Sequence, residues 1–406
     1  MLFALAWRNL WRRPQRTVLS LISIALVSGL LVFVLSFQDG VYGQMKETTL
    51  RIFDGYAQFQ PVGYASDPRL ELTISDPGGL AQRAVLLKGV TAAAPRVNGF
   101  AILANGGRSY AAAVVGVDPA SEAKISTIAD RISAGSYLTP ADTDGAVLGN
   151  ILAKNLGVGV GDKVTLLGQA RDGSVAADVL RVTGIYHSGI ADLDRTIMEM
   201  PFARAQATFG MEGEANTIAL AGPSLSDVNA ALPALDQLAR RQGATLRDWQ
   251  AMEPAMRDTI DLKYATSMVF YVSLVLVVAF IILNTLLMSV LERTREFGMQ
   301  LALGMRGGQI GAMVWIELLM LAIGGCAVGV AIGAAVTAYF QHTGIVYPID
   351  PKLLAQFGVP RRLVPSLTWF SAMTGPAALV AAVLVGGLVP YLRVSRLTPA
   401  IAMRAA

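Results

Sequence analysis

Four long apolar runs divide the chain, and a polar region of more than half its length separates the first run from the second. The runs cover 17–38, 263–291, 310–340 and 369–391. Each run reaches the roughly 20 apolar residues that a helix needs to cross a bilayer. The pattern predicts an α-helical membrane protein with four transmembrane helices and a large α+β domain, 39–262, outside the membrane between the first two.

The composition agrees with this interpretation. Hydrophobic residues make up 53% of the chain and charged residues only 15%, whereas soluble domains carry about 25% charged residues. The single cysteine, Cys326, lies in an apolar run, so no disulfide can form within the chain. No basic cluster is interleaved with aromatic residues, so nucleic acid is not among the predicted partners.

The short polar pieces are basic, and this asymmetry predicts the orientation. Together 1–16, 292–309 and 392–406 hold ten arginines and two glutamates, whereas the domain 39–262 holds 19 basic and 25 acidic residues. Short cytoplasmic loops carry the excess of Lys and Arg. We therefore predict a membrane protein with both termini in the cytoplasm. The domain would lie on the external side, as would the loop 341–368, whose basic residues are a mild exception.

The first apolar run follows a basic segment, as in a signal peptide. No small-x-small cleavage site follows it, and the run is long enough to span. The sequence therefore favours a retained signal anchor over a cleaved signal.

The polar domain has the pattern of an α+β fold with two subdomains, one built from both flanks and the second inserted into it. Strands are predicted at 111–117, 164–167, 179–186 and 217–220, and helices at 145–156 and 226–242. The second helix has Ser226 as a plausible N-cap and Gly243 after its end.

The second apolar run belongs to an unusually long helix. No proline or glycine interrupts the chain between Pro254 and Leu291. Thirty-eight helical residues span about 57 Å, and the hydrocarbon core is only about 30 Å thick. We predict a stalk that starts near 254; a break at the membrane surface is the alternative. For the first run, an extension to Arg51 is weakened by Gly40 and Gly43.

The segment 292–309 joins two apolar runs and has the pattern of a short amphipathic helix. Phe297 and Leu301 form an apolar stripe, and Gly304 permits a bend at the end. Its charged residues are Glu292, Arg293, Arg295, Glu296 and Arg306. Such a helix can insert an aromatic anchor, here Phe297, into a groove of a partner. The alternative is a loop that rests on lipid headgroups, held by snorkelling arginines.

Four stretches resemble the FtsX-like permeases of ABC transporters, which include macrolide-exporter and lipoprotein-release types. The most specific is 284–304, Asn-Thr-Leu-Leu-Met-Ser-Val-Leu-Glu-Arg-Thr-Arg-Glu-Phe-Gly-Met-Gln-Leu-Ala-Leu-Gly. The others are 6–17, 149–164 and 392–404. The resemblance implies that 1–16 is an amphipathic cytoplasmic helix and that 292–309 is the coupling helix that docks into an ATPase subunit.

The resemblance also implies the location and the partners. The protein would lie in the bacterial inner membrane, with both termini in the cytoplasm and the domain 39–262 in the periplasm. No G-x-x-x-x-G-K-[ST] motif occurs in the sequence, so ATP and Mg would be bound by a separate ATPase and this chain would carry no cofactor. Two ABC ATPase subunits and a second permease subunit, identical or paralogous, would complete the complex. Its work would be lipoprotein release or export of a hydrophobic compound, with a periplasmic carrier, adaptor or outer-membrane protein as outer partner.

Two other function classes remain open. The first is a signalling or regulatory membrane protein that controls a periplasmic partner such as a cell-wall hydrolase. The second is a secondary transporter, which is disfavoured because four spans are few and no repeat halves are visible.

Within the apolar runs, three features are candidates for function. Gly325, Gly329 and Gly333 recur every four residues, a spacing that lets helices approach closely; they predict contact with a second permease or the fourth span, or packing within one subunit. Glu317 is an intramembrane carboxylate that would pair with an arginine near the cytoplasmic face, or lie at the interface. Flexible and aromatic residues could line a hydrophobic substrate cleft or belong to ordinary packing: Phe37, Met45, Tyr264, Met268 and Tyr271.

The sequence holds few candidate catalytic or metal-binding residues. His187 and His342 lie in different loops, and neither has a His or Cys at metal-ligand spacing. Asp192 and Asp194 are better explained as solvated acids than as a cation site. We predict no catalytic residue and no metal site.

Overall fold

The computed structural model describes residues 2–12, 14–346, 348 and 362–396. The chain divides into two compact units. The helical unit comprises Met1–Gly43, Thr259–Tyr347 and Arg362–Ala406, and the α/β unit comprises mainly Gln44–Asp258. Arg13, Lys352, Arg361 and Arg404 lie outside the described residues, as do half of the predicted loop 341–368 and most of the tail 392–406.

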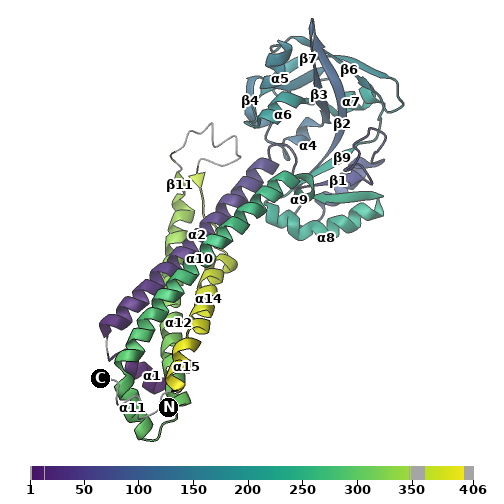
Figure 1. The fold of residues 1–406 in the computed structure, drawn as a ribbon. Coiled ribbons are helices and arrows are strands. Elements are labelled where there is room, and N and C mark those ends of the chain that lie inside the picture. Colours follow the sequence, from purple (N-terminus) through teal and green to yellow (C-terminus); the bar gives the residue numbers. More distant parts are fainter. Residues whose placement is uncertain (1, 13, 347, 349–361, 397–406) are drawn as a thin grey trace. The chain divides into compact units, whose positions relative to one another are not determined.

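Four helices of the described chain are long and apolar enough to cross a membrane (Figure 1). They are α2 (Pro14–Leu50), α10 (Pro254–Glu292), α12 (Gly307–Thr343) and the pair formed by α14 (Trp369–Gly386) and α15 (Leu388–Ser395). The predicted fold class, four spanning helices with a large domain between the first and second, is confirmed.

Short helices and a hairpin complete the helical unit. Helix α1 (Leu2–Leu10) precedes α2, and α11 (Thr294–Ala302) lies between α10 and α12. Strands β11 (Ile345–Val346) and β12 (Arg362–Leu363) pair in antiparallel fashion between α12 and α14. The last spanning helix begins where the Thr368 hydroxyl accepts a hydrogen bond from the Ser371 amide, which satisfies one otherwise unpaired N–H.

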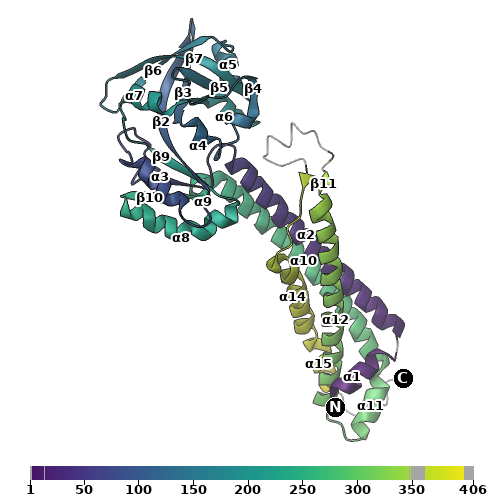
Figure 2. The same cartoon turned by 180° about the vertical axis from the view of Figure 1, so that it is seen from behind.

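The α/β unit is built on one ten-stranded sheet with the order β10-β1-β9-β2-β3-β8-β5-β7-β4, and β6 pairs with β2 and β7. Figure 2 labels strands β2 to β7, β9 and β10 of this sheet. Its strands are β1 (Ala57–Pro61), β2 (Ala92–Asn105), β3 (Arg108–Val117), β4 (Ile132–Gly135), β5 (Gly145–Gly149), β6 (Lys163–Gln169), β7 (Val175–Tyr186), β8 (Ile197–Pro201), β9 (Thr217–Ala221) and β10 (Ala244–Asp248). Strands β1 and β10, from the two flanks of the domain, pair along their whole length.

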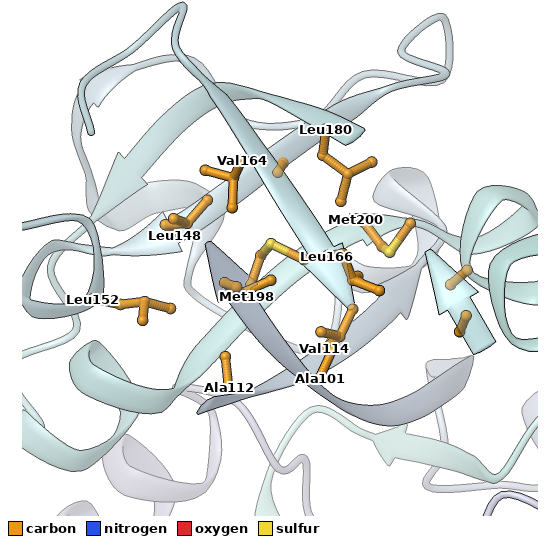
Figure 3. Close-up of a cluster of buried hydrophobic side chains, with 14 of the residues drawn as sticks. Ala101, Ala112, Val114, Leu148, Leu152, Val164, Leu166, Leu180, Met198 and Met200 are labelled. Carbon is orange, nitrogen blue, oxygen red and sulfur yellow. The ribbon is translucent and has the colours of Figure 1, made fainter. Parts of the chain in front are cut away.

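Seven helices accompany the sheet. They are α3 (Pro77–Val85), α4 (Pro119–Glu122), α5 (Asn150–Leu156), α6 (Ala191–Thr196), α7 (Phe202–Phe209), α8 (Leu225–Arg241) and α9 (Trp249–Met252). One apolar core lies under the strands β2, β3 and β5 to β8, where Val114, Leu148, Leu166, Leu180 and Met198 meet (Figure 3). A second cluster includes Val115, Val147 and Tyr186, whose side chains point to the other face of these strands.

All four predicted strands lie within β3, β6, β7 and β9. The predicted helix 145–156 is wrong in its first part, because 145–149 is the strand β5 with every residue buried. A short, fully apolar run fits a central strand as well as a helix, and pairing with β7 and β8 decides the outcome here. Helix α8 begins one residue before the predicted start, and its N-cap is Ser224 rather than Ser226.

Candidate functional site: the helix between two spanning helices

The site is the short helix α11 together with the residues that fix it to the bundle. Helix α10 ends at Glu292, and Arg293, with φ −98° and ψ 6°, separates it from α11. The helix ends where Gly304 adopts a left-handed φ of 98°, a conformation that glycine adopts without steric cost. A reversal of the chain at this point leads into α12.

One face of α11 is buried against its own chain. The Phe297 side chain is 0% exposed and belongs to the apolar core of the bundle. Leu301 and Met305, partly buried, pack against the same core. The prediction that Phe297 inserts into a partner protein is therefore wrong, because the ring is already enclosed by the helices of this chain. Helical spacing identified the stripe correctly but could not tell which surface it faces.

The opposite face of α11 is open and mixes apolar and cationic side chains. Met299 is 52% exposed and Leu303 is 87% exposed. Arg295, Ala302 and Arg306 are exposed beside them. Residues 295, 299 and 303 are four apart and therefore follow one line along the surface. We name Arg295, Met299 and Leu303 the docking face.

A buried ion pair fixes the start of α11 to α12. Arg293 Nη1 lies 3.1 Å from Glu317 Oε2, and the Asn9 amide of α1 donates to Glu317 Oε1 at 2.9 Å. Glu317 is only 5% exposed. The Arg293 guanidinium also lies over the Phe297 ring, 5.2 Å from its centroid. Arg293 is thus the arginine partner expected for Glu317, and three separate helices meet at this carboxylate.

Two further ion pairs join the start of α2 to the α10–α11 corner. Arg16 donates to both carboxylate oxygens of Glu292, at 2.6 and 2.8 Å. Arg12 lies 3.5 Å from Glu296. The bidentate geometry of the Arg16–Glu292 pair fixes the relative orientation of the two side chains as well as their distance. Sequence reasoning named Glu292 and Glu296 but missed Arg12 and Arg16 as their partners, since a single sequence carries no sign of contacts between residues 276 and 284 positions apart.

The three predicted glycines of α12 contact the first spanning helix. A Cβ on Gly325 would lie 2.6 Å from Ile24 Cβ, and one on Gly329 would lie 2.5 Å from the Ala25 carbonyl oxygen. A Cβ on Gly333 would lie 2.7 Å from the carbonyl oxygen of Gly29. The glycines therefore mark a close approach of α12 to α2 inside one chain, not to the fourth span.

The residues of the predicted substrate cleft do not line one common hollow. The Tyr271 hydroxyl donates to the Gln38 side chain, and Tyr271 lines a hollow of about 410 Å³ between α2 and α10. The Tyr264 hydroxyl donates to Asp39 at 3.2 Å, and Met268 is exposed on α10.

The other two residues of the predicted cleft belong to different surroundings. Phe37 stacks on Phe33, with ring centroids 6.2 Å apart, and Phe33 in turn contacts Phe340 of α12. Met45 belongs to the α/β unit. The hollow along α2 and α10 is therefore lined by Tyr271 but not by the rest of the set.

The aspartates near residue 190 form a local hydrogen-bonded turn. Asp194 is buried, accepts from the Ser188 amide at 2.8 Å and lies 2.7 Å from His187 Nδ1; the expectation that it is solvated is wrong. Asp192 is exposed. Within the described chain, no group of three or more His, Cys, Asp or Glu is placed to hold a metal ion.

Four spanning helices, a helix fixed between the second and third, and an α/β domain inserted after the first define a polytopic membrane protein of the permease class. Residues 268–399 match the FtsX-like permease C-terminal family, and residues 17–238 match the MacB-like periplasmic core domain. The chain therefore belongs to the FtsX-like permeases with a MacB-like periplasmic core domain.

Relatives resemble the chain over most of its length. It is 25% identical to the lipoprotein-releasing system transmembrane protein LolC of Neisseria meningitidis, over 96% of this chain and 94% of the relative. It is 26% identical to LolE of Haemophilus influenzae over 98% of both chains. The pyoverdine export ATP-binding/permease protein PvdT of Pseudomonas aeruginosa is 25% identical over 82% of this chain and 50% of the relative.

A solved structure resembles part of the chain. The periplasmic region of MacB from Actinobacillus actinomycetemcomitans aligns with a TM-score of 0.38 and 13% identity, over 50% of this chain and 91% of that one.

Proposed function

We propose that this chain is the permease subunit of an ABC transporter, in which a separate ATPase binds the docking face of α11 and drives a change of shape in the α/β unit. The observation that carries the proposal is the two-sided character of α11. One side is fixed to the bundle by Phe297 and by the Arg293–Glu317 pair. The other side exposes Met299 and Leu303.

The docking face has the chemistry of a helix that fits a groove of a protein partner. Two apolar side chains one turn apart supply anchors, and Arg295 beside them supplies orientation and association rate more than affinity. ATP and Mg would be held by the partner, since the sequence contains no phosphate-binding loop motif. Two ATPase subunits and a second permease subunit would complete the transporter.

The ion pairs at the corner support a mechanical role. Arg16–Glu292 connects α2 to the end of α10, and Arg12–Glu296 connects the segment before α2 to α11. Arg293–Glu317 connects the start of α11 to α12. A displacement of α11 by the ATPase would therefore move the inner ends of the first three spans together. In this arrangement α11 and the N-terminal helix α1 lie on the cytoplasmic side of the bacterial inner membrane, and the α/β unit lies in the periplasm.

The substrate class we propose is lipoprotein leaving the membrane for a periplasmic carrier. The support is the coverage of the relatives: LolC and LolE match over nearly their whole lengths, whereas only half of PvdT, an ATP-binding/permease protein by name, is covered.

The experiment is co-purification of the chain with its cognate ABC ATPase from detergent. Met299→Asp combined with Leu303→Asp should abolish co-purification and return the ATPase rate to that of the free ATPase, because two charges would enter an apolar groove. The matched control is Val175→Asp, which places the same charge at a 77% exposed apolar position of the α/β unit. Unchanged co-purification of the double variant would overturn the proposal.

A second assay tests the substrate class. The complex, reconstituted in proteoliposomes, should release a triacylated lipoprotein into solution when ATP and a soluble acceptor for lipid chains are present. An intact, ATP-hydrolysing complex that releases none would contradict lipoprotein release and favour export or a regulatory role.

A further inference from the structure

A buried cluster of charged residues lies at the outer end of α2. Arg96 of β2 is 1% exposed, and more than one carboxylate lies near it. Glu122 of α4 and Glu199 of β8 are both buried, and Asp54 follows α2. A charge of this kind in a protein interior must be paired and hydrogen-bonded.

Arg96 donates hydrogen bonds to two different parts of the chain. Its Nε and Nη2 donate to the two carboxylate oxygens of Glu122, at 3.0 and 2.6 Å. Nη2 also donates to the Phe53 carbonyl oxygen at 2.5 Å. The guanidinium lies over the Phe53 ring, 4.5 Å from its centroid. Phe53 is three residues beyond Leu50, where α2 ends. Arg96 is therefore bonded directly to the chain that leaves the first spanning helix.

A second contact holds the same segment. The Thr127 amide donates to the Arg51 carbonyl oxygen at 2.9 Å, and Leu50 is fully buried. The residues after α2 are thus held by β2 on one side and by the loop after α4 on the other. A flexible linker would show neither contact.

Arg96 occupies a special position in the sheet. It is the last residue of β2 that pairs with β9, opposite Thr217, and the first that pairs with β3, opposite Val117. Beyond it, β2 pairs with β6 from Ala101 onward. The pairing partner of β2 therefore changes at Arg96. On one side lies the part of the sheet made of β10, β1 and β9, and on the other lies the part made of β3 to β8.

The neighbouring acids leave Glu122 as the partner of Arg96. Glu199 accepts a hydrogen bond from the Tyr137 hydroxyl at 2.7 Å. Burial, and the negative charge of Glu122, raise the pKa of Glu199 to about 8. The raised pKa favours the uncharged form of Glu199 at neutral pH. The ionised carboxylate that pairs with the Arg96 guanidinium is therefore that of Glu122.

We infer that Arg96 is a positioning residue that locks the outer end of α2 to the junction of the two parts of the sheet, so that movement of the first spanning helix reaches the α/β unit. This inference rests on the proposed function, because it supplies the outer end of the path that begins at α11. A buried ion pair that served packing alone could be replaced by apolar side chains without consequence for movement.

The test uses the full chain in lipid nanodiscs, with Cys326→Ala as background and spin labels at two introduced cysteines. Thr48→Cys places one label on α2, and Lys154→Cys places the other on the exposed side of α5. The probe variant is Arg96→Met with Glu122→Leu, which removes both members of the ion pair. The matched control is Arg171→Met with Glu214→Leu, which removes an ion pair of the same domain that does not touch α2.

The distance distribution between the labels should widen in the Arg96 variant and stay as in the parent chain in the control. Arg96→Lys is the conservative variant: it keeps a positive charge near Glu122 but lacks the planar fork that reaches both Glu122 and Phe53. It should retain the unfolding temperature and still widen the distribution. Distributions equal to that of the parent in both Arg96 variants would overturn the inference.

A second label pair separates this inference from the proposed function. Gln237→Cys on α8 and Lys154→Cys report on the two parts of the sheet. In complex with the ATPase, ADP-vanadate should shift their distance in the parent chain, and the shift should be lost in the Arg96 variant. No shift in the parent chain would contradict the proposed function, while the first label pair would still decide the role of Arg96. An equal shift in parent and variant would overturn the inference alone.

Discussion

Arg293 and Glu317 form an ion pair of 3.1 Å that connects the start of α11 to the interior of α12. Both side chains are largely withdrawn from solvent, at 12% and 7% exposed. Breaking one partner of a buried pair costs about 3–5 kcal/mol, whereas replacing both by apolar groups is often neutral. The pair is thus better explained by the position it gives to α11 than by net stability.

Glu317→Leu should lower the unfolding free energy of the detergent-solubilised chain by about 3–5 kcal/mol, because the largely buried Arg293 loses its partner at 3.1 Å and is left with Glu296 at 3.6 Å. Arg293→Met combined with Glu317→Leu should recover most of that loss. Thermal unfolding followed by circular dichroism measures both. If the single variant is as stable as the double variant, the pair is not buried as described.

Phe297 and Leu303 should respond in opposite ways to truncation, because one packs in the bundle and the other is exposed. Phe297→Ala removes a core ring and should cost about 3–5 kcal/mol of stability. Leu303→Ala should stay within about 0.5 kcal/mol of the parent chain but weaken binding of the ATPase. Stability and affinity measured on the same two variants check this, and a reversed order would place the wrong face of α11 in the core.

Gly325→Ala and Gly324→Ala form a matched pair on neighbouring positions of α12. A Cβ at Gly325 would meet Ile24 Cβ at 2.6 Å, whereas one at Gly324 meets only the end of the Leu21 side chain at 3.5 Å. Overpacking of this kind costs about 1–3 kcal/mol, so Gly325→Ala should unfold at a lower temperature than Gly324→Ala. Equal unfolding temperatures would show that α2 and α12 are further apart.

Glu199 should make the stability of the chain depend on pH between about 5 and 8. Its pKa is raised to about 8 by burial and by the Glu122 charge, with Tyr137 and Arg96 acting in the opposite direction. The folded state therefore holds a proton that the unfolded state releases, and stability falls as pH rises through this window.

The expected slope is at most about 1.4 kcal/mol per pH unit. Glu199→Gln should remove this contribution, and unfolding temperatures measured from pH 6 to 8.5 on both chains test it. The difference between the two chains cancels the contribution of every group that they share. A parent chain whose stability rises with pH relative to Glu199→Gln would mean that the carboxylate is ionised in the folded state.

The spans and the helix between them follow from the sequence because each is a local property. A helix that crosses the bilayer needs about 20 apolar residues in succession. The charged segment 292–304 separates two such runs. Four strands of the α/β unit were also predictable from local patterns. The strand at 145–149 was not, since its burial depends on β7 and β8, which lie elsewhere in the chain.

The candidate site was predictable as a segment but not as a surface. Phe297 and Leu303 are both apolar and six residues apart, and only the packing of α11 against α1, α12 and α15 decides which one is buried. The same holds for Arg16 and Arg96. Their types are visible in the sequence, but their partners Glu292 and Glu122 are set by the tertiary fold.

The central claim is that the docking face of α11 contacts an ATPase. The most direct measurement is cross-linking from single cysteines at Leu303 and, as a buried control, at Phe297, in the full complex with Cys326 replaced by alanine. A thiol-to-amine reagent should join the Leu303→Cys chain to the ATPase subunit and leave the Phe297→Cys chain uncoupled. A complex that co-purifies intact yet gives no ATPase cross-link from Leu303→Cys would contradict the account.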